Sequence, residues 1–151
     1  MDVVDEISPQ MKPKPEARLA TVQALFQVEQ GGGSVDWVKS QFIDHRLSDT
    51  ADVELFEKLL TGTVQSISTL DPQIAPALSD TWKLERIDAT LRAILRCGVF
   101  ELTNAPEIPA PVLLDAYVDL TAAFFDDKET AFVNAVLDRL ARDIRPGNLD
   151  T

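Results

Sequence analysis

The sequence predicts an all-α protein of about six or seven helices arranged in two packed helical bundles. Apolar residues recur at spacings of three and four along most of the chain, the pattern of helices with one buried face. No stretch alternates apolar and polar residues for long, as a half-buried strand would. Prolines and glycines are spaced for helices rather than for short strands.

The clearest of these patterns covers residues 84–102 and predicts a central helix. Gly98 lies on its apolar face, where the absence of a side chain lets another helix approach closely. Asp88 and Arg92 are four residues apart, so we expect them to form an ion pair. Arg96 is expected at the surface or in an ion pair between the two bundles.

Three helices are predicted before this one, over residues 15–30, 35–45 and 51–70. Pro15 suits the first turn of the first helix, and three consecutive glycines end it. Ser34 is a good N-cap for the second helix. Asp49 or Thr50 can cap the third, and a proline after Asp71 is expected to end it.

The remaining chain predicts a short helix within residues 72–82, then the central helix and two more. We expect Trp82 to fill the junction between the bundles, although a ring at this point also suits stacking on a ligand. A helix over residues 110–125 follows. Asp126 and Glu129 have the spacing of a capping box, which starts the last helix.

The predicted domain organisation is one helical domain over residues 15–146, in a chain of 151 residues. Its N-terminal lobe of three helices covers residues 15–71, and its C-terminal lobe covers residues 72–146. Residues 1–14 and 147–151 are predicted to be tails.

The composition is strongly acidic, with 25 Asp and Glu against 14 Lys and Arg and a net charge of −11. That balance argues against broad, non-specific nucleic-acid binding, which depends on neutralising phosphates. No apolar run approaches the roughly 18 residues that a membrane span needs. The N-terminus lacks the features of a signal peptide, so we expect a cytoplasmic protein.

No catalytic or metal-binding constellation is evident. The one histidine, His45, is expected at the surface at a helix end, and the one cysteine, Cys97, is expected as a buried thiol. They lie too far apart in the sequence for a usual His/Cys metal motif. The glycines follow a helix and lack the lysine of a phosphate-binding loop. We therefore predict no enzyme, no metal and no cofactor.

Three segments in order resemble the NusB family of bacterial transcription antitermination factors. They are Val22-Gln23-Ala24-Leu25-Phe26 in the first helix, Arg92-Ala93-Ile94-Leu95-Arg96 with Phe100-Glu101-Leu102 in the central helix, and Phe132-Val133-Asn134-Ala135-Val136-Leu137-Asp138 in the last. Pro109 also matches the proline before the family's sixth helix. The resemblance covers about residues 15–146.

The resemblance implies an all-α fold of two small bundles and no enzymatic activity. It implies binding to the boxA segment of nascent RNA, as a single strand, together with NusE, which is also a ribosomal protein. The complex acts within the transcription elongation complex, notably on ribosomal RNA operons. No membrane partner is implied.

The family's RNA site, carried over by position, falls on Lys12, Lys14, Arg18, Lys128 and Phe132. The basic residues are expected to contact phosphates, and the phenylalanine ring to stack on a base. Each basic residue also fits the interpretation of an ordinary solvated charge. The phenylalanine also fits a core position at the start of the last helix.

Several surface positions depart from the family pattern. Two family lysines are replaced by Pro111 and Ala122, and a His-Lys pair by Thr130-Ala131. Each lost phosphate contact weakens RNA binding. The alternative function is therefore a NusB-like module for protein–protein interaction that has lost most RNA binding. It would bind a basic protein or form a homodimer, with Tyr117, Phe124 and Phe125 as a candidate aromatic patch.

Overall fold

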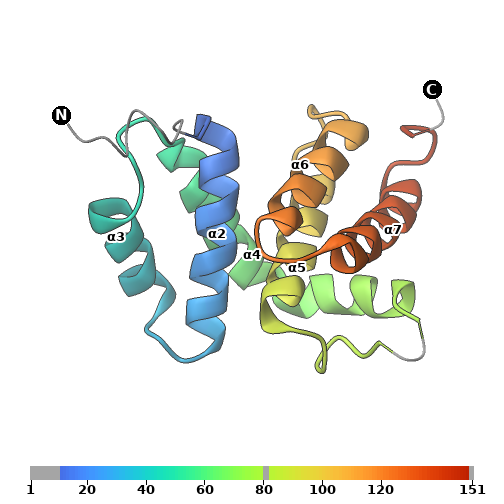
Figure 1. Ribbon diagram of the computed structural model, residues 1–151, viewed down its shortest axis with the longest axis horizontal. Coiled ribbons are helices and arrows are strands. Elements are labelled where there is room, and N and C mark those ends of the chain that lie inside the picture. The colour runs from blue at the N-terminus through green and yellow to red at the C-terminus, as the bar shows by residue number, and fades with distance from the viewer. Residues whose placement is uncertain (1–10, 80–81, 150–151) are drawn as a thin grey trace.

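The computed structural model describes residues 11–79 and 82–149 as an all-helical fold (Figure 1), so the predicted fold class is confirmed. No strand occurs in these two ranges, and no helix there is long and apolar enough to cross a membrane. The elements of this part of the chain are α2 (Pro13–Glu29), α3 (Val35–His45), α4 (Val53–Ile74), the 3₁₀-helix η1 (Ala75–Ala77), α5 (Ala89–Asn104), α6 (Ala110–Ala122) and α7 (Asp127–Ile144).

Helix α5, yellow in Figure 1, is the central element, as the sequence predicts. It packs against α2, α4, α6 and α7, whereas α3 lies at one side of the molecule and packs on α2 and α4. Buried apolar side chains from all six α-helices form one continuous core. The division into two lobes at residues 71 and 72 stays a prediction, and both residues lie inside α4.

The start of α5 differs from the prediction. The helix begins at Ala89 rather than at Leu84, because Asp88 caps it: one carboxylate oxygen accepts hydrogen bonds of 2.7 and 3.3 Å from two amides of the first turn. Leu84 and Ile87 remain in the core, but they lie in the turn before the helix. Asp88 is therefore a helix cap, and Arg92 finds its ion-pair partner elsewhere.

Helix α4 continues to Ile74, past the predicted end at Leu70. Pro72 lies within its last turn, where it cannot donate a backbone hydrogen bond. Leu70 and Ile74 are both buried in the core, so tertiary packing outweighs the local preference of the proline. At the other end, Asp52 caps the helix by accepting a 2.9 Å hydrogen bond from the amide of Leu55. The predicted caps were Asp49 or Thr50.

Helix α2 begins at Pro13 rather than at Pro15, so the last two residues of the predicted N-terminal tail are helical. Residues 1–10 of that tail lie outside the described residues. The helix ends where Gly31 adopts a φ of +80°, a conformation that favours glycine. At the C-terminus, residues 147–149 form a turn after α7, and residues 150–151 lie outside the described part.

Two other predicted caps are confirmed. The Ser34 hydroxyl accepts a 3.1 Å hydrogen bond from the backbone amide of Trp37 at the start of α3. Asp126 and Glu129 form the predicted capping box of α7, in which the Asp126 amide donates to the glutamate side chain at 3.3 Å. This box fixes where α7 begins, and therefore how its first turn is presented.

The predicted close approach at Gly98 is also confirmed. A Cβ atom on Gly98 would lie 3.2 Å from both terminal methyl carbons of Leu137 on α7 and 3.6 Å from the ring of Tyr117 on α6. The first distance is tighter than ordinary contact, so a larger residue would require the Leu137 side chain to shift.

Candidate nucleic-acid interface

The residues predicted to contact RNA occupy three different environments. Lys12 and Lys14 lie at the start of α2, and Lys128 and Phe132 lie in the first turns of α7. Arg18 lies in the core, with 6% of its surface exposed. The structure therefore divides the predicted site into two surface groups and one buried residue.

Lys12 is the N-cap residue of α2, and Lys14 lies in the first turn between Pro13 and Pro15. Both lysines are exposed, and neither forms an ion pair within the part of the chain that the structure describes. The prolines hold the backbone near the conformation that starts a helix. Two unpaired ammonium groups on a rigid helix end can approach a phosphate without breaking a protein contact.

The charge next to these lysines is mixed. Lys14 lines a cavity of about 300 Å³ between the starts of α2 and α4 and the end of α5. Lys58 of α4 lines the same cavity and adds positive charge, whereas Asp52, Glu54 and Glu107 add negative charge. The positive region at the start of α2 is therefore small and bordered by acidic residues.

Arg18 was predicted to contact RNA, but the structure places its guanidinium in a buried ion pair with Glu101 of α5. The Arg18 Nε donates to Glu101 Oε1 at 2.7 Å, and Nη2 donates to Oε2 at 3.1 Å. In such a bidentate pair, two N–H groups of the planar guanidinium each donate to one oxygen of the carboxylate. The sequence contains a sign of this burial, because Arg18 is four residues before Val22, on the apolar face of the first helix.

The same carboxylate joins α2 and α5 to α6. The Tyr117 hydroxyl donates to Glu101 Oε1 at 2.6 Å and lies 3.0 Å from the Cys97 sulfur. Glu101 falls four residues after Cys97 on the buried face of α5, so its charge requires a buried partner of opposite charge. The sequence analysis did not identify Glu101 as the partner of Arg18.

Burial and hydrogen bonding shift the pKa values of three groups in this network. Burial opposes the charge on Arg18, but the hydrogen bond and the charge of Glu101 outweigh it, so the pKa of Arg18 is raised. Burial is also the main cause that raises the pKa of Tyr117 well above its usual value. It raises the pKa of the Cys97 thiol to about 12, which keeps the thiol protonated at neutral pH. Cys97 is buried, as predicted.

At the start of α7, Phe132 and Lys128 both contact Trp82. The Phe132 and Trp82 ring centroids are 4.9 Å apart with an interplanar angle of 33°. The Lys128 ammonium lies 5.7 Å from the centroid of the indole ring. Both rings are partly buried against the core and partly open to solvent, so Phe132 is neither a pure core residue nor a free surface residue.

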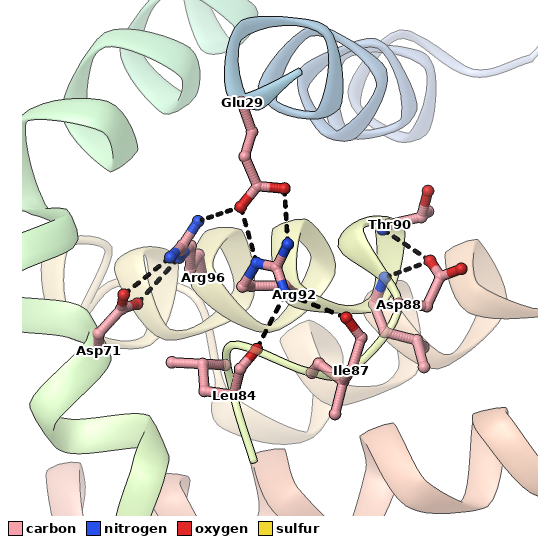
Figure 2. A network of polar contacts seen from close by, with 9 residues as sticks. Glu29, Asp71, Leu84, Ile87, Asp88, Thr90, Arg92 and Arg96 are labelled. Atoms are coloured by element: carbon pink, nitrogen blue, oxygen red, sulfur yellow. Dashed lines mark hydrogen bonds and ion pairs between the residues drawn. The ribbon is translucent and has the colours of Figure 1, made fainter. Parts of the chain in front are cut away.

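Arg92 and Arg96 of α5 are held by acidic residues from two other helices (Figure 2). Arg92 makes hydrogen bonds of 2.7 Å to both carboxylate oxygens of Glu29 at the end of α2. Arg96 donates to both oxygens of Asp71 on α4, at 2.9 and 2.7 Å, and also reaches Glu29 at 3.2 Å. The predicted ion pairs between the two halves of the chain are present, but Arg92 pairs with Glu29 rather than with Asp88.

Arg92 also fixes the turn before α5. Its Nη1 donates to the carbonyl oxygens of Leu84 and Ile87 at 2.9 and 3.0 Å (Figure 2). Because these carbonyls do not take part in a longer α5, the arginine satisfies acceptors that the helix leaves open. The hydrogen bond from Arg92 is the main cause that lowers the pKa of Glu29.

Arg145, just after α7, also binds backbone carbonyls at an end of α5, as Arg92 does. Its guanidinium donates to the carbonyl oxygens of Leu102 at 2.9 Å and Ala105 at 2.7 Å, and also to that of Ile108. These carbonyls lie at the end of α5 and in the connection to α6. A cation at this helix end matches the negative pole of the α5 dipole.

The structure also places the three residues of the candidate aromatic patch and the histidine. Tyr117 is fully buried, so it does not belong to an exposed aromatic patch, whereas Phe124 is 38% exposed and Phe125 is partly buried. His45 is exposed at the end of α3, as predicted. In the described part of the chain, no group of three or more His, Cys, Asp or Glu residues could hold a metal ion.

Comparisons with known proteins decide the family. The model of the NusB family matches residues 15–142, which is most of the chain and includes all or most of each helix from α2 to α7. The chain belongs to the NusB family. It is 45% identical over 137 residues to a transcription antitermination protein NusB of Rhizobium leguminosarum bv. trifolii, covering 85% of this chain and 86% of the relative. A NusB of Sinorhizobium medicae is 42% identical over 149 residues, covering 93% of each chain.

Solved structures of NusB proteins share the fold. A structure of T. maritima NusB superimposes with a TM-score of 0.76 at 27% identity, covering 93% of this chain and all of the other. A structure described as antitermination factors NusB and NusE in complex with dsRNA matches with a TM-score of 0.74 at 25% identity. That match covers 85% of this chain and 96% of the other, so the likeness extends over most of both chains.

Proposed function

We propose that this protein is a transcription antitermination factor that binds boxA-type single-stranded RNA together with the ribosomal protein NusE. In that role it joins the transcription elongation complex and regulates ribosomal RNA operons, in the cytoplasm and without enzymatic activity. The observation that carries the proposal is the identity of 45% with a curated NusB over 85% of the chain. A similar fold in a complex with NusE and RNA supports the choice of partners.

The proposed contacts follow from the placement of the predicted residues. Lys12 and Lys14 contact phosphates from the start of α2, and Lys128 contacts a phosphate at the start of α7. Phe132 stacks on an unpaired base, because its ring is partly open to solvent. Arg18 acts indirectly. Its pair with Glu101 holds the first turns of α2 against α5, and so positions Lys12 and Lys14.

The charge of the chain implies that RNA binding depends on the partner. A net charge of −11 repels RNA over most of the surface, and the proposed site supplies three lysines. A basic ribosomal protein bound alongside would add phosphate contacts and complement the acidic surface. We therefore expect weak binding of boxA RNA by the protein alone and stronger binding with NusE.

The second candidate function is a NusB-like module for protein–protein interaction that has lost most RNA binding. The observation in its favour is the set of residues on the exposed face of α6. Its residues Pro111 and Ala122, which replace family lysines, are exposed, and the acidic Asp115 and Asp119 are exposed beside them. An acidic helix face repels phosphates and suits a basic protein or, together with the exposed Phe124, a second copy of the chain.

A titration of labelled boxA RNA with the full chain, with and without NusE and at two salt concentrations, separates these functions. The proposal predicts saturable binding that is weak alone, stronger with NusE and weaker at high salt. A scrambled RNA of the same length is the control for non-specific attraction. Absence of RNA binding under every condition, with NusE binding or dimerisation retained, would select the protein module instead.

A further inference from the structure

Trp82 contacts both Phe132 and Lys128, the two residues of α7 in the proposed RNA site, which together form the RNA corner. Its indole ring packs on Phe132, and the ammonium of Lys128 lies over the same indole. Trp82 comes from the segment before α5, far from α7 in the sequence. The geometry therefore brings a third side chain to a site that the family motif places on α7 alone.

We propose that Trp82 is a positioning residue of this RNA corner: it holds Phe132 where the ring can stack on an unpaired base, and Lys128 where the ammonium can contact the adjoining phosphate. This inference rests on the proposed RNA-binding function. It adds to that function a residue, and a physical role, that resemblance to the family motif does not supply.

The partial burial of the two rings supports a positioning role. Trp82 and Phe132 each pack against the continuous core on one side and remain partly open to solvent on the other. A ring held in this way loses little side-chain freedom when a base stacks on it, so more of the stacking free energy appears as affinity. A freely rotating phenylalanine on an exposed helix would lose more.

The charges around Lys128 give the indole a second effect. Lys128 lies in the first turn of α7 between the acidic residues Asp127 and Glu129, and the capping residue Asp126 is close in the sequence. Attraction between the ammonium and the face of the indole favours a position beside the aromatic pair rather than toward these carboxylates. The cation is therefore kept next to the ring on which a base would stack.

The segment that carries Trp82 also carries positive charge. Lys83 and Arg86 follow Trp82 in the sequence, both are exposed, and neither forms an ion pair with any residue in the described ranges. Residues 82–86 and the start of α7 together carry three cations, two partly exposed rings and four acidic residues, Glu85 among them. Such a mixed surface suits one stacked nucleotide better than a long run of phosphates.

The chain offers a matched control, because it has two tryptophans. Trp37 on α3 is 52% exposed and belongs to neither surface group of the proposed site. In the full chain with Trp37→Phe, Trp82 is the one remaining indole. We expect its fluorescence to change on titration with boxA RNA, at the same RNA concentration as binding measured independently. The Trp82→Phe chain, which retains Trp37, should show no such change.

Affinity measurements with NusE present test the role itself. Trp82→Leu should lower the affinity for boxA RNA about tenfold, as expected for the loss of one ordered stacking contact. Trp82→Phe keeps an aromatic face and should lower it less, and Trp37→Leu should leave it unchanged. Binding of NusE in the absence of RNA should be equal in all four proteins, and circular dichroism and thermal unfolding confirm that each variant is folded.

Two results would overturn the inference. One is an RNA affinity of a folded Trp82→Leu chain equal to that of the unmodified chain. The other is an equal loss of NusE binding, which would make the corner a protein interface. Failure of the unmodified chain to bind RNA with NusE present is a different result: it removes the proposed function, and this inference with it.

Discussion

Four arginines and three lysines of this protein occupy two different kinds of region. Around α5, the guanidinium groups of Arg18, Arg92, Arg96 and Arg145 are bound to carboxylates or to backbone carbonyls. At the starts of α2 and α7, Lys12, Lys14 and Lys128 form no ion pair within the described residues. The first region holds helices together, and the second presents positive charge to solvent.

This difference shows why charge counts alone mislead in this chain. Arginine binds carboxylates in a fixed two-pronged geometry, which suits it to joining helices in the interior. A paired arginine adds little to the external field, so 14 basic residues provide few phosphate contacts. The unpaired lysines stand at helix starts, exposed to solvent but with acidic residues close by. An acidic protein can therefore keep two small groups of unpaired cations, which are the proposed phosphate contacts.

The largest expected effect is on the buried pair. Glu101→Gln leaves the Arg18 charge without a counter-charge in the core, and we expect a loss of about 3–5 kcal/mol in the free energy of unfolding. Urea denaturation of both proteins measures it, with the exposed Glu107→Gln as the control. A variant as stable as the unmodified chain would show that Arg18 does not depend on this carboxylate.

The next effect concerns the end of α5. Arg145→Met removes the charged donor from several backbone carbonyls, although the Ala105 carbonyl keeps its hydrogen bond from the amide of Ile108. We expect a loss of about 2 kcal/mol, the usual range for hydrogen bonds to a charged group. The matched control is Arg139→Met, because Arg139 is exposed on the neighbouring helix α7. Similar urea midpoints for the two variants would argue against a special role for Arg145.

A smaller effect is expected at Glu29, and it depends on pH. The hydrogen bond from Arg92 lowers the pKa of Glu29 in the folded protein below its ordinary value of 4.5. Glu29 therefore stabilises the fold fully above pH 4.5, and this contribution is lost as the pH falls through the lowered pKa. We expect Glu29→Gln to cost about 1 kcal/mol at pH 7.

Thermal unfolding of both proteins between pH 7 and pH 3 checks the sign. The difference in melting temperature between the unmodified chain and Glu29→Gln should shrink as the solution becomes more acidic. A constant difference over the whole range would mean that the glutamate acts through packing and not through its charge.

Most of the fold could be predicted from the sequence, because the apolar spacing that buries a helix face is local information. The errors lie where tertiary contacts decide. Pro72 is kept inside α4 because Leu70 and Ile74 are anchored in the core. Asp88 caps α5 while Arg92 turns to Glu29, a residue that only the folded chain brings near.

The candidate site was less predictable for the same physical reason. The family resemblance assigns Lys12, Lys14 and Phe132 to the RNA site by their positions in the sequence. It does not show whether a side chain at such a position is buried. Arg18 occupies a basic position of the motif, yet a glutamate 83 residues away pairs with it in the core. The contact between Trp82 and Phe132 likewise joins distant segments, so neither residue alone predicts it.

The measurement that tests this division most directly is the salt dependence of boxA RNA affinity in the presence of NusE. If Lys12 and Lys14 contact phosphates, the double variant Lys12→Gln/Lys14→Gln should make the slope of log affinity against log salt shallower by about 1.4. Its stability should not change. Arg92→Met should lower stability and leave the slope as it is. An unchanged slope in the lysine variant, or an equal reduction in both, would contradict the account.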